Sequence, residues 1–414
     1  MALTEVIAET LRAAGGWLSF AEFMQLALYA PGLGYYSAGA TKIGAAGDFV
    51  TAPTLSPLFA RSCARRIDHW LDLLGERAVL EFGPGTGHFA ADALPVLGAS
   101  AGPRRRYELL EVSADLRERQ QRLLQGNPWP VDLEWRSALP ESFCGVVFAN
   151  EILDALPAER FIVRADAWWR LGVGLAPRSA SGRSATKGES SAFEWRIRPA
   201  DGACRDDAVF VAEAAHRREW LAAAGVELPE GYCGEWQAAL APWFEALAAS
   251  LGRAVVLIAD YGLPRRQLLH PDRSQGSLRC HYRHHALGDP FTYPGLLDIT
   301  TWVDFTRVAE VAERAGFALA GFTTQAGFLL GAGLDREWSA ALAAIEAPGA
   351  AASQDEVMRD ARPRQLELAR GVNRLLLPGE MGEAVKFMLL TRGIPKEMFA
   401  AEPAFSRQDL RASL

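Results

Sequence analysis

The chain has 414 residues, of which half are hydrophobic, and its 43 Lys and Arg against 50 Asp and Glu leave a formal net charge of −7. This length allows a large buried core, either in one elaborated domain or in two lobes. The acidic balance and the lack of a polybasic arm in the sequence argue against a nucleic-acid partner.

The first 78 residues predict a helical extension that precedes the main fold. Ser19 to Glu22 reads as a capping box that opens an amphipathic helix, and Pro31-Gly32 ends it. A glycine-rich segment from Gly32 to Gly47 is too irregular for a helix or a strand. Ser56-Pro57 then begins a second amphipathic helix, which continues to Gly75.

From residue 79 onward, apolar runs alternate with helical stretches. Four runs stand at 79–82, 107–112, 146–149 and 255–259, and helices are expected at 88–97 and after Ser113. This alternation predicts a parallel α/β sheet covered on both faces. Two further runs, at 317–323 and 387–391, are interpreted as a closing antiparallel pair. Ligands in such folds bind beyond the carboxyl ends of the strands.

Residues 161–250 interrupt this alternation. Short antiparallel strands are expected at 161–163, 168–175 and 193–197, followed by helices near 211–224 and 236–250. We interpret this stretch as an inserted α+β subdomain on the ligand side of the sheet. Its tryptophans are expected to form the core of the insert: Trp168, Trp169, Trp236 and Trp243.

The stretch V-L-E-F-G-P-G-T-G-H-F-A at 79–90 places three glycines at alternate positions after an apolar run. Gly85, Gly87 and Ala90 fit the dinucleotide pattern G-x-G-x-x-A. Together with Gly83 and Glu81, the same glycines fit the E-x-G-x-G-x-G loop of enzymes that use S-adenosylmethionine (SAM). The two interpretations imply different chemistry.

The residues around these glycines favour SAM. A dinucleotide loop directs backbone N–H groups at a pyrophosphate, whereas Pro84 has no N–H to donate. SAM has no phosphate, and its sulfonium and ammonium groups favour a nearby carboxylate such as Glu81. Glu111, at the end of the next run, can accept ribose hydroxyls from either cofactor. A dinucleotide site or a plain glycine turn remains as an alternative.

Eight segments spread over nearly the whole chain carry a family resemblance: L-A-L-Y-A-P-G-L-G-Y-Y (26–36), K-I-G-A-A-G-D-F-V-T-A-P-T-L-S-P-L-F (42–59), L-E-F-G-P-G-T-G (80–87), N-E-I-L-D-A-L-P (150–157), A-D-Y-G (259–262), C-H-Y-R-H-H (280–285), D-I-T-T-W-V-D-F (298–305) and P-G-E-M-G (378–382). The chain resembles the MidA family of class I SAM-dependent methyltransferases, found in bacteria and mitochondria. Thr54 stands where this family usually has an acidic residue, and His285 where an arginine is expected.

The resemblance implies a Rossmann-like methyltransferase sheet of seven strands with SAM at the loop 83–87. For the mitochondrial branch it implies methylation of a protein arginine during assembly of respiratory complex I. We therefore divide the chain into an N-terminal helical extension with a cofactor lid (1–78), a SAM-binding α/β core (79–160), an inserted substrate-side subdomain (161–250) and the remainder of the core with C-terminal helices (251–414).

Asn150, Glu151 and Asp154 follow the third apolar run, where class I enzymes place a substrate-facing loop. Methyl transfer is an in-line displacement that requires alignment and an electron-rich nucleophile. Carboxylates that hold one side of a guanidinium can aim a lone pair at the methyl group and take up the released proton. If the chain is helical here, Glu151 and Asp154 share one face and form an arginine clamp. The alternative is that Asn150 and Glu151 cap a helix and Asp154 is solvated.

The segment from Lys42 to Pro53 has too many glycines for a packed helix and too many apolar residues for a free tail. We expect it to fold over the cofactor and to bring Asp48, Thr51 and Pro53 close to SAM. A purely structural turn is the alternative.

Polar residues nearer the C-terminus receive simpler interpretations. Cys280 and His281, with two further histidines, lack the spacing of a zinc site, so no metal is expected. Asp298 is explained as a helix cap, with Asp304 flanking the same helix start. Tyr261, just after the fourth run, is placed at the border of the substrate pocket.

We therefore predict a SAM-dependent methyltransferase that acts on an arginine side chain of a protein, with no nucleic acid as partner. A small-molecule or RNA methyltransferase on the same fold is one alternative, and a non-catalytic assembly factor that binds SAM is another. Five scattered cysteines, no secretory signal and no apolar run near the roughly 20 residues of a membrane helix predict a cytoplasmic protein without a membrane span.

Overall fold

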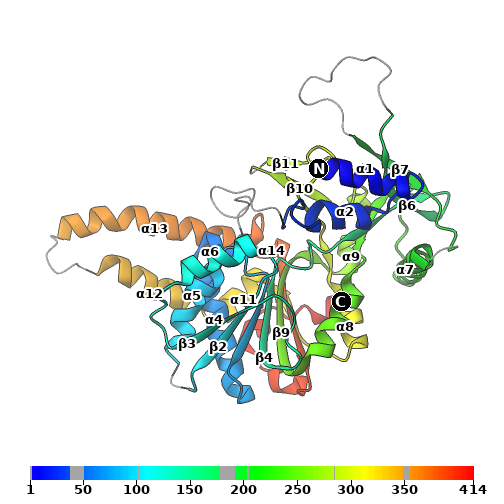
Figure 1. Ribbon diagram of the computed structural model, residues 1–414. Helices are drawn as coiled ribbons and strands as arrows, with labels where there is room; N and C mark the ends of the chain where they lie inside the picture. The colour runs from blue at the N-terminus through cyan, green and yellow to red at the C-terminus, as the bar shows by residue number, and fades with distance from the viewer. Residues whose placement is uncertain are drawn as a thin grey trace.

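The computed structural model describes residues 2–37, 51–100, 102–177, 192–202, 205–283, 285–347 and 354–414 (Figure 1). Its centre is a sheet whose strands run in the order β14-β15-β9-β4-β1-β2-β3. These strands are β1 (Ala78–Phe82), β2 (Arg105–Leu110), β3 (Val131–Arg136), β4 (Phe143–Asn150), β9 (Leu251–Leu263), β14 (Ala318–Thr324) and β15 (Val385–Arg392). The two-residue strand β13 (Val303–Asp304) pairs with the end of β9.

The direction of the strands confirms the predicted fold class. β3, β2, β1, β4 and β9 are mutually parallel, and β15 runs antiparallel to both of its neighbours. The runs expected at 317–323 and 387–391 form the closing pair, with Ala318 opposite Thr391. Because the five parallel strands end at one edge, the loops after β1, β2, β4 and β9 meet there.

Helices cover both faces of this sheet. On one face lie α4 (Pro57–Leu74), α5 (His88–Gly98), α6 (Ala114–Leu124), α11 (Gln325–Gly331), α12 (Leu334–Glu346), α13 (Gln354–Leu376), α14 (Met381–Ala384) and α15 (Pro403–Ser406); on the other lie α8 (Leu240–Ser250) and α10 (Phe305–Arg314). The predicted helix starts are present: the Ser56 hydroxyl accepts a hydrogen bond from the Leu58 N–H, and the Ser113 hydroxyl accepts one from Leu116.

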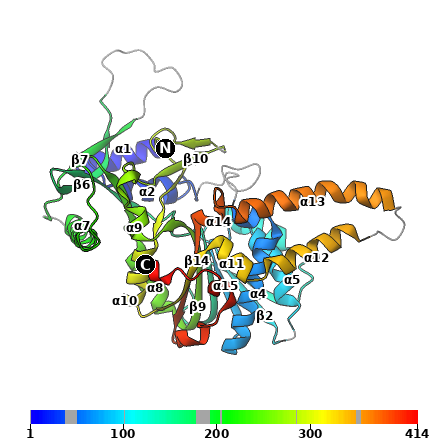
Figure 2. The same cartoon turned by 180° about the vertical axis from the view of Figure 1, so that it is seen from behind.

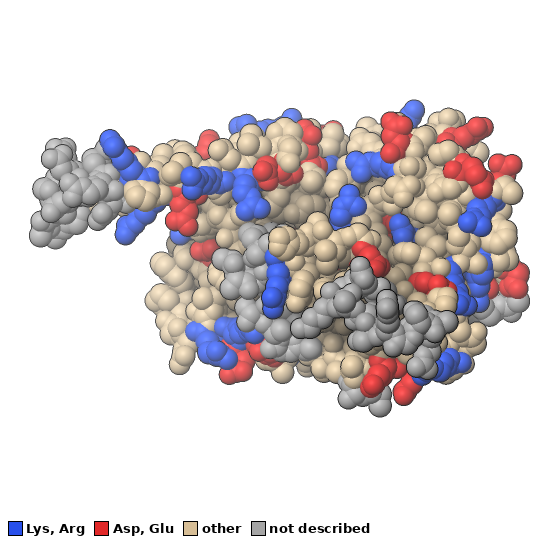
Figure 3. Space-filling model, turned by 90° about the horizontal axis from the view of Figure 1, so that it is seen from above, with Lys and Arg blue, Asp and Glu red and all other residues tan. Residues whose placement is uncertain are grey.

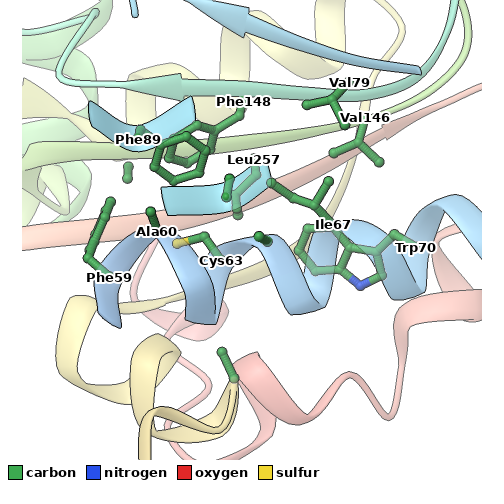
Figure 4. Close-up of a cluster of buried hydrophobic side chains, with 14 of the residues drawn as sticks. Phe59, Ala60, Cys63, Ile67, Trp70, Val79, Phe89, Val146, Phe148 and Leu257 are labelled. Carbon is green, nitrogen blue, oxygen red and sulfur yellow. The ribbon is translucent and has the colours of Figure 1, made fainter. Parts of the chain in front are cut away.

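The core between α4 and the sheet is formed by large apolar side chains at helical spacing (Figure 4). Ile67 and Trp70 of α4 lie against Val79 and Val146 of the strands. The rings of Phe89 and Phe148 stack with centroids 4.1 Å apart. Burial of each such side chain stabilises the fold by roughly 1.5–3 kcal/mol, so this layer fixes α5 and the loop before it.

The remaining elements form a layer above the carboxyl edge of the central sheet (Figure 1). It contains a four-stranded antiparallel sheet, β7-β6-β5-β8, and a three-stranded sheet, β11-β10-β12, together with α1, α2 and α7. Their bounds are α1 (Leu3–Ala13), α2 (Phe20–Tyr29), β5 (Ala158–Arg164), β6 (Ala167–Leu175), β7 (Phe193–Arg198), α7 (Arg205–Ala223), β8 (Cys233–Gln237), β10 (Arg279–Tyr282), β11 (His285–Leu287) and β12 (Asp298–Thr300). The short helices α3 (Ala52–Leu55) and α9 (Arg265–Leu268) complete the fold, with 3-10 turns at Pro271–Arg273, Lys396–Phe399 and Arg411–Ser413.

Aromatic contacts join this upper layer together. Phe23 of α2 packs edge-on against Phe193 of β7 and Phe291, with centroids 6.0 and 5.2 Å apart. Phe161 of β5 stacks on Trp168 at 4.0 Å, and Trp236 lies 5.5 Å from the same ring. Trp168 and Trp236 therefore belong to the core of the insert, as the sequence predicts.

Candidate active site

A cavity of about 370 Å³ lies at the carboxyl edge of the central sheet. Its wall combines the glycine loop after β1, the ends of β2 and β4, the segment around α3 and two tyrosines from α2 and the turn after it. The lining residues are Tyr29, Tyr36, Thr51, Pro53, Thr54, Glu81, Phe82, Gly83, Pro84, Gly85, Thr86, His88, Phe89, Leu110, Glu111, Val112, Leu116, Asn150, Glu151, Ile152, Ala155, Leu156 and Trp243. This is the edge at which the fold places ligands.

The glycine loop needs glycine for its conformation. Gly83, Gly85 and Gly87 have φ angles of 54°, 57° and 85°, in the left-handed region that residues with a Cβ avoid. A Cβ on Gly83 would also lie 2.5 Å from the Cδ1 atom of Ile152. The loop therefore brings bare backbone to the cavity, and Gly87 leads directly into α5.

Glu81, predicted to face the cofactor, presents a buried carboxyl group to this cavity. Its Oε2 atom accepts a hydrogen bond of 2.8 Å from the Tyr107 hydroxyl. Burial raises the pKa of Glu81 to about 8, and the negative charge of Glu111 adds to this rise. In the described part of the chain, no arginine or lysine pairs with Glu81. A cationic ligand would stabilise its charged form, which fits a sulfonium or ammonium group.

Glu111 lies at the end of β2 and is held in place by two donors. Its Oε1 atom accepts a hydrogen bond of 2.8 Å from the Ser113 N–H, and its Oε2 atom accepts one of 3.2 Å from Gln120. The Gln120 amide also donates to the Gly85 carbonyl at 2.8 Å. The buried Gln120 therefore couples Glu111 to the glycine loop, a role that sequence reasoning missed, because a glutamine on a polar helix gives no signal.

The segment before α4 and the start of α8 complete the cofactor wall. Of the three residues expected close to SAM, Thr51 and Pro53 line the cavity, and Asp48 lies outside the described residues. Val112 is 77% exposed and lines the cavity, so it offers an apolar surface that a nucleoside base would cover. Trp243 was expected in the core of the insert, and that prediction is wrong: the residue lines this cavity and packs on Phe82 at 5.6 Å.

Asn150 is the last residue of β4, Glu151 follows it, and both line the cavity. Residues 151–157 form turns and not the helix considered in the sequence analysis. The Asn150 amide donates to the Glu151 Oε1 atom at 3.1 Å. Glu151 has a φ of 53°, unusual for a residue with a side chain. The i,i+3 helical geometry proposed for Glu151 and Asp154 is therefore wrong, and a left-handed turn positions both instead.

Asp260, at the end of β9, holds this turn in place. Its Oδ2 atom accepts hydrogen bonds from the Ile152 and Leu153 N–H groups at 3.0 and 2.7 Å, and its Oδ1 atom accepts one from Tyr261 at 2.8 Å. The Glu151 N–H donates to the Ala259 carbonyl at 2.8 Å. These bonds supply the stabilisation that a residue in a strained conformation requires.

Four carboxyl groups gather at this place: Glu151, Asp154, Asp260 and Asp298. Burial, followed by mutual repulsion, raises the pKa of Asp154, and burial raises that of Glu151 to about 8. Within the described residues, no ion pair joins Glu151, Asp154 or Asp260 to a cationic side chain. Like charges concentrated in this way favour a bound cation or a shared proton.

Asp298 reaches the cluster from β12 and is bound by a tyrosine. The Tyr36 hydroxyl donates to its Oδ1 atom at 2.8 Å, and the Tyr29 ring stacks on Tyr36 at 5.5 Å. The expectation that Asp298 caps a helix is wrong, because Asp304 caps α10 by accepting a hydrogen bond of 3.0 Å from the Arg307 N–H. Sequence reasoning missed Asp298 and Tyr36, whose contact joins positions 262 residues apart.

Neither a metal cluster nor a membrane helix is found in the described ranges. No group of three or more His, Cys, Asp and Glu side chains in these ranges is arranged to hold a metal ion, and His284 lies outside them. Among the same residues, no helix combines the length and apolar character needed to cross a bilayer.

Comparison with known proteins decides the family. A family model described as "Putative S-adenosyl-L-methionine-dependent methyltransferase" matches residues 59–323. The chain belongs to this family of methyltransferases. Its cofactor is therefore SAM, and the resemblance seen in the sequence is confirmed. The dinucleotide alternative for the glycine loop is set aside.

Solved and curated relatives agree with this assignment. A crystal structure from Burkholderia thailandensis, described as a "likely methyl transferase" bound to S-adenosyl-homocysteine, is 37% identical, superposes with a TM-score of 0.83 and covers 100% of this chain and 96% of that one. The rat protein arginine methyltransferase NDUFAF7, mitochondrial, is 26% identical over 91% of this chain and 81% of its own. The human protein of the same name is 25% identical over 91% and 80%.

The residues of this methyltransferase fit SAM. Glu81 offers a buried carboxyl group to a cation, the bare backbone at Gly83 permits close approach, and Glu111 offers oxygens to hydroxyl groups. When bound, SAM supplies a methyl group on a cationic sulfur. The acidic cluster borders the same cavity through Glu151.

Proposed function

We propose that this methyltransferase transfers the methyl group of SAM to an arginine side chain of a protein. The observation that supports the proposal is the cluster of Glu151, Asp154, Asp260 and Asp298 beside the cofactor cavity. A guanidinium is always charged in water and presents several donors in a plane. Closely spaced carboxyl groups can balance this charge and accept hydrogen bonds from these donors. The name of the mitochondrial relatives points to the same acceptor.

The chemistry that these side chains would perform is alignment and proton transfer. A guanidinium nitrogen forms a bond to the methyl carbon while the carbon–sulfur bond breaks, and S-adenosylhomocysteine and a proton are released. Glu151 and Asp154 would hold the guanidinium through charge-assisted hydrogen bonds and accept that proton. A carboxyl group whose pKa is raised to about 8, as in Glu151, is matched to proton transfer near neutral pH.

The aromatic pair Tyr29 and Tyr36 adds a second means of holding the acceptor. Both rings line the cavity, and a planar guanidinium stacks well on an aromatic face. Burial raises the pKa of both hydroxyl groups, with Asp298 adding to the rise, so they remain protonated donors at neutral pH. Tyr36 keeps Asp298 oriented through its hydrogen bond.

The surface is less suited to RNA. On the face above the carboxyl edge, Lys and Arg residues are interspersed with Asp and Glu (Figure 3). RNA binding without sequence contacts depends on continuous positive charge along the phosphate backbone. Among protein acceptors, a respiratory complex I subunit is the one that the family resemblance suggests testing first.

The test is methylation of a cell lysate with radiolabelled SAM. We expect label in a protein band, and methylarginine after acid hydrolysis of that band. Label in the small-molecule fraction or in RNase-sensitive material would support the alternative acceptors. Tight SAM binding without any transfer would support an assembly factor and refute the enzyme that we propose.

Matched variants tie the result to the cluster. Glu151→Gln and Asp154→Asn should abolish the labelled band. Glu141→Gln, which removes an exposed carboxylate just before the start of β4, should preserve it. Full labelling by both cluster variants with unchanged SAM affinity would refute the arginine clamp.

A further inference from the structure

The helices α12 and α13 form a hairpin that extends away from the body of the molecule (Figures 1 and 2). At its base, α13 packs against α3, α11 and α14. The Gln325 amide donates to the Leu375 carbonyl at 2.9 Å, and the Gln365 amide donates to Glu346 of α12 at 2.8 Å. The hairpin is therefore anchored at one end and projects into solvent at the other.

The outer face of α13 carries a row of arginines. Arg362, Leu366, Arg370 and Arg374 recur every four residues and are all exposed, Leu366 by 52%. Residues at this spacing lie on one side of a helix. The opposite side, which includes Ala361 and Leu375, is buried against the protein. We call this row the arginine face.

The charge of this face differs from that of the whole chain. Residues 361–376 contain four Arg and one Glu, whereas the whole chain has a net charge of −7. Within the described residues, no carboxylate pairs with Arg362 or Arg370, and Arg374 approaches Glu380 only at 3.9 Å. Figure 3 shows blue residues along the described part of this arm. Among the side chains that the structure describes, the arginine face is thus a positive surface with few paired charges.

The helix that carries the arginine face packs next to the active site through its opposite, buried side. A Cβ on Gly371 would lie 2.4 Å from the Leu55 carbonyl oxygen, so α13 contacts α3 backbone to backbone. The Ala52 N–H of α3 donates a hydrogen bond to Glu151. Thr51, Pro53 and Thr54 of the same segment line the cavity. A macromolecule bound along α13 would therefore lie close to the segment that lines the cavity.

We propose that the arginine face docks an acidic segment of the protein that carries the acceptor arginine. The proposal rests on the proposed function, since the acceptor must be part of a macromolecule that reaches beyond the cavity. Exposed arginines attract acidic partners over long range and give specificity through charge complementarity. A protein fits better than a membrane, because Leu366 is the one large apolar residue within the row.

The test separates docking from catalysis by measuring binding alone. The probe is a fluorescent glutamate-rich peptide with a single arginine. The control peptide has the same sequence with glutamine in place of glutamate. Fluorescence anisotropy at low ionic strength gives the dissociation constant of each. We compare the wild type, Arg362→Glu/Arg370→Glu and the control Arg77→Glu/Arg218→Glu, which makes the same charge change at two exposed arginines elsewhere.

The acidic peptide should bind the wild type and the control alike, and the Arg362→Glu/Arg370→Glu variant roughly tenfold more weakly. The glutamine peptide should bind all three weakly. Equal binding of the acidic peptide to all three proteins, or no binding to the wild type, would overturn the proposal. So would tighter binding of phosphatidylglycerol vesicles or single-stranded RNA through the same arginines.

A second measurement distinguishes this proposal from the proposed function. If methyl transfer from SAM to the peptide arginine is absent while acidic binding depends on Arg362 and Arg370, docking stands and arginine methylation fails. If both peptides are methylated with the same KM by the wild type and the variant, arginine methylation stands and docking fails.

Discussion

The two ends of the cavity are built in different ways. At the cofactor end, Glu81 and Glu111 come from two adjacent strands, and each carboxyl group accepts at least one hydrogen bond from a neutral donor. At the acceptor end, four carboxyl groups come from three separate stretches of the chain. Both ends hold buried carboxyl groups whose pKa burial raises, and the acceptor end crowds more of these groups together.

This difference has a physical consequence. A site of two carboxyl groups, each held by hydrogen bonds, needs little rearrangement to bind its ligand, so it is preorganised. A site of crowded carboxyl groups is held apart by repulsion and gains most from a cation. We expect changes at the two ends to affect different steps: SAM binding at one, and methyl transfer at the other.

The largest effect is expected from the acceptor end. Glu151→Gln and Asp154→Asn should each lower kcat by roughly 10²–10⁴-fold, the range for loss of a positioned acid–base group. SAM affinity, measured by calorimetry, should change by less than about threefold, a shift below 1 kcal/mol. The control Glu141→Gln should match the wild type. A parallel loss of SAM affinity and kcat would mean that the two ends are one site.

The next largest effect is expected at the cofactor end. Glu81→Gln removes the carboxylate charge that a cation stabilises. Because a hydrogen bond to a charged group contributes about 1.5–3 kcal/mol, SAM binding should weaken by roughly 10–100-fold. Since the pKa of the unliganded Glu81 is about 8, SAM binding at pH 7 should release protons.

Calorimetry in buffers of different ionisation enthalpy measures that proton release, and Glu81→Gln should reduce it. Tyr107→Phe is the companion variant, since it keeps the carboxylate and removes only its 2.8 Å hydrogen bond. Unchanged proton release in Glu81→Gln would show that Glu81 does not ionise on binding.

A smaller effect is expected from the residue that holds the acceptor turn. Asp260→Asn removes the negative charge and replaces one of the two oxygen atoms that accept hydrogen bonds from three backbone N–H groups. The variant should lower kcat by roughly tenfold, or 1.4 kcal/mol. The pH profile of kcat should shift as well, because Asp260 is among the charges that raise the pKa of Asp154 and Glu151. An unchanged pH profile with lower thermal stability would make Asp260 a structural residue only.

The smallest effect is expected on stability without ligands. The pKa of Glu151 is 4.5 in the unfolded chain and about 8 in the folded protein. Between these two pH values the folded state therefore binds more protons than the unfolded state. Stability therefore falls as pH rises from about 4.5 to about 8. Glu151→Gln should show a shallower fall of Tm over this window than the wild type and Glu141→Gln do. Identical slopes would contradict a raised pKa at Glu151.

Local sequence was sufficient to predict several parts of this protein. Glycines at 83, 85 and 87 permit the left-handed backbone that this loop adopts, and Glu81 follows from its place in the strand before them. Ser19, Ser56 and Ser113 cap the helices that they precede, because capping depends on neighbours within three residues. The family, the fold class and the cofactor were therefore predictable from short motifs in order along the chain.

Tertiary structure decided the acceptor end. The turn at Glu151 is not helical, because Asp260 from another strand binds its backbone N–H groups. Asp298 serves as a partner of Tyr36 across 262 residues, and Trp243 turns to the cavity instead of the insert. Such contacts depend on which strand ends lie side by side, and no local pattern encodes that. The sequence by itself thus determined the methyl donor, while only the folded chain brought together the four carboxyl groups beside the cofactor cavity.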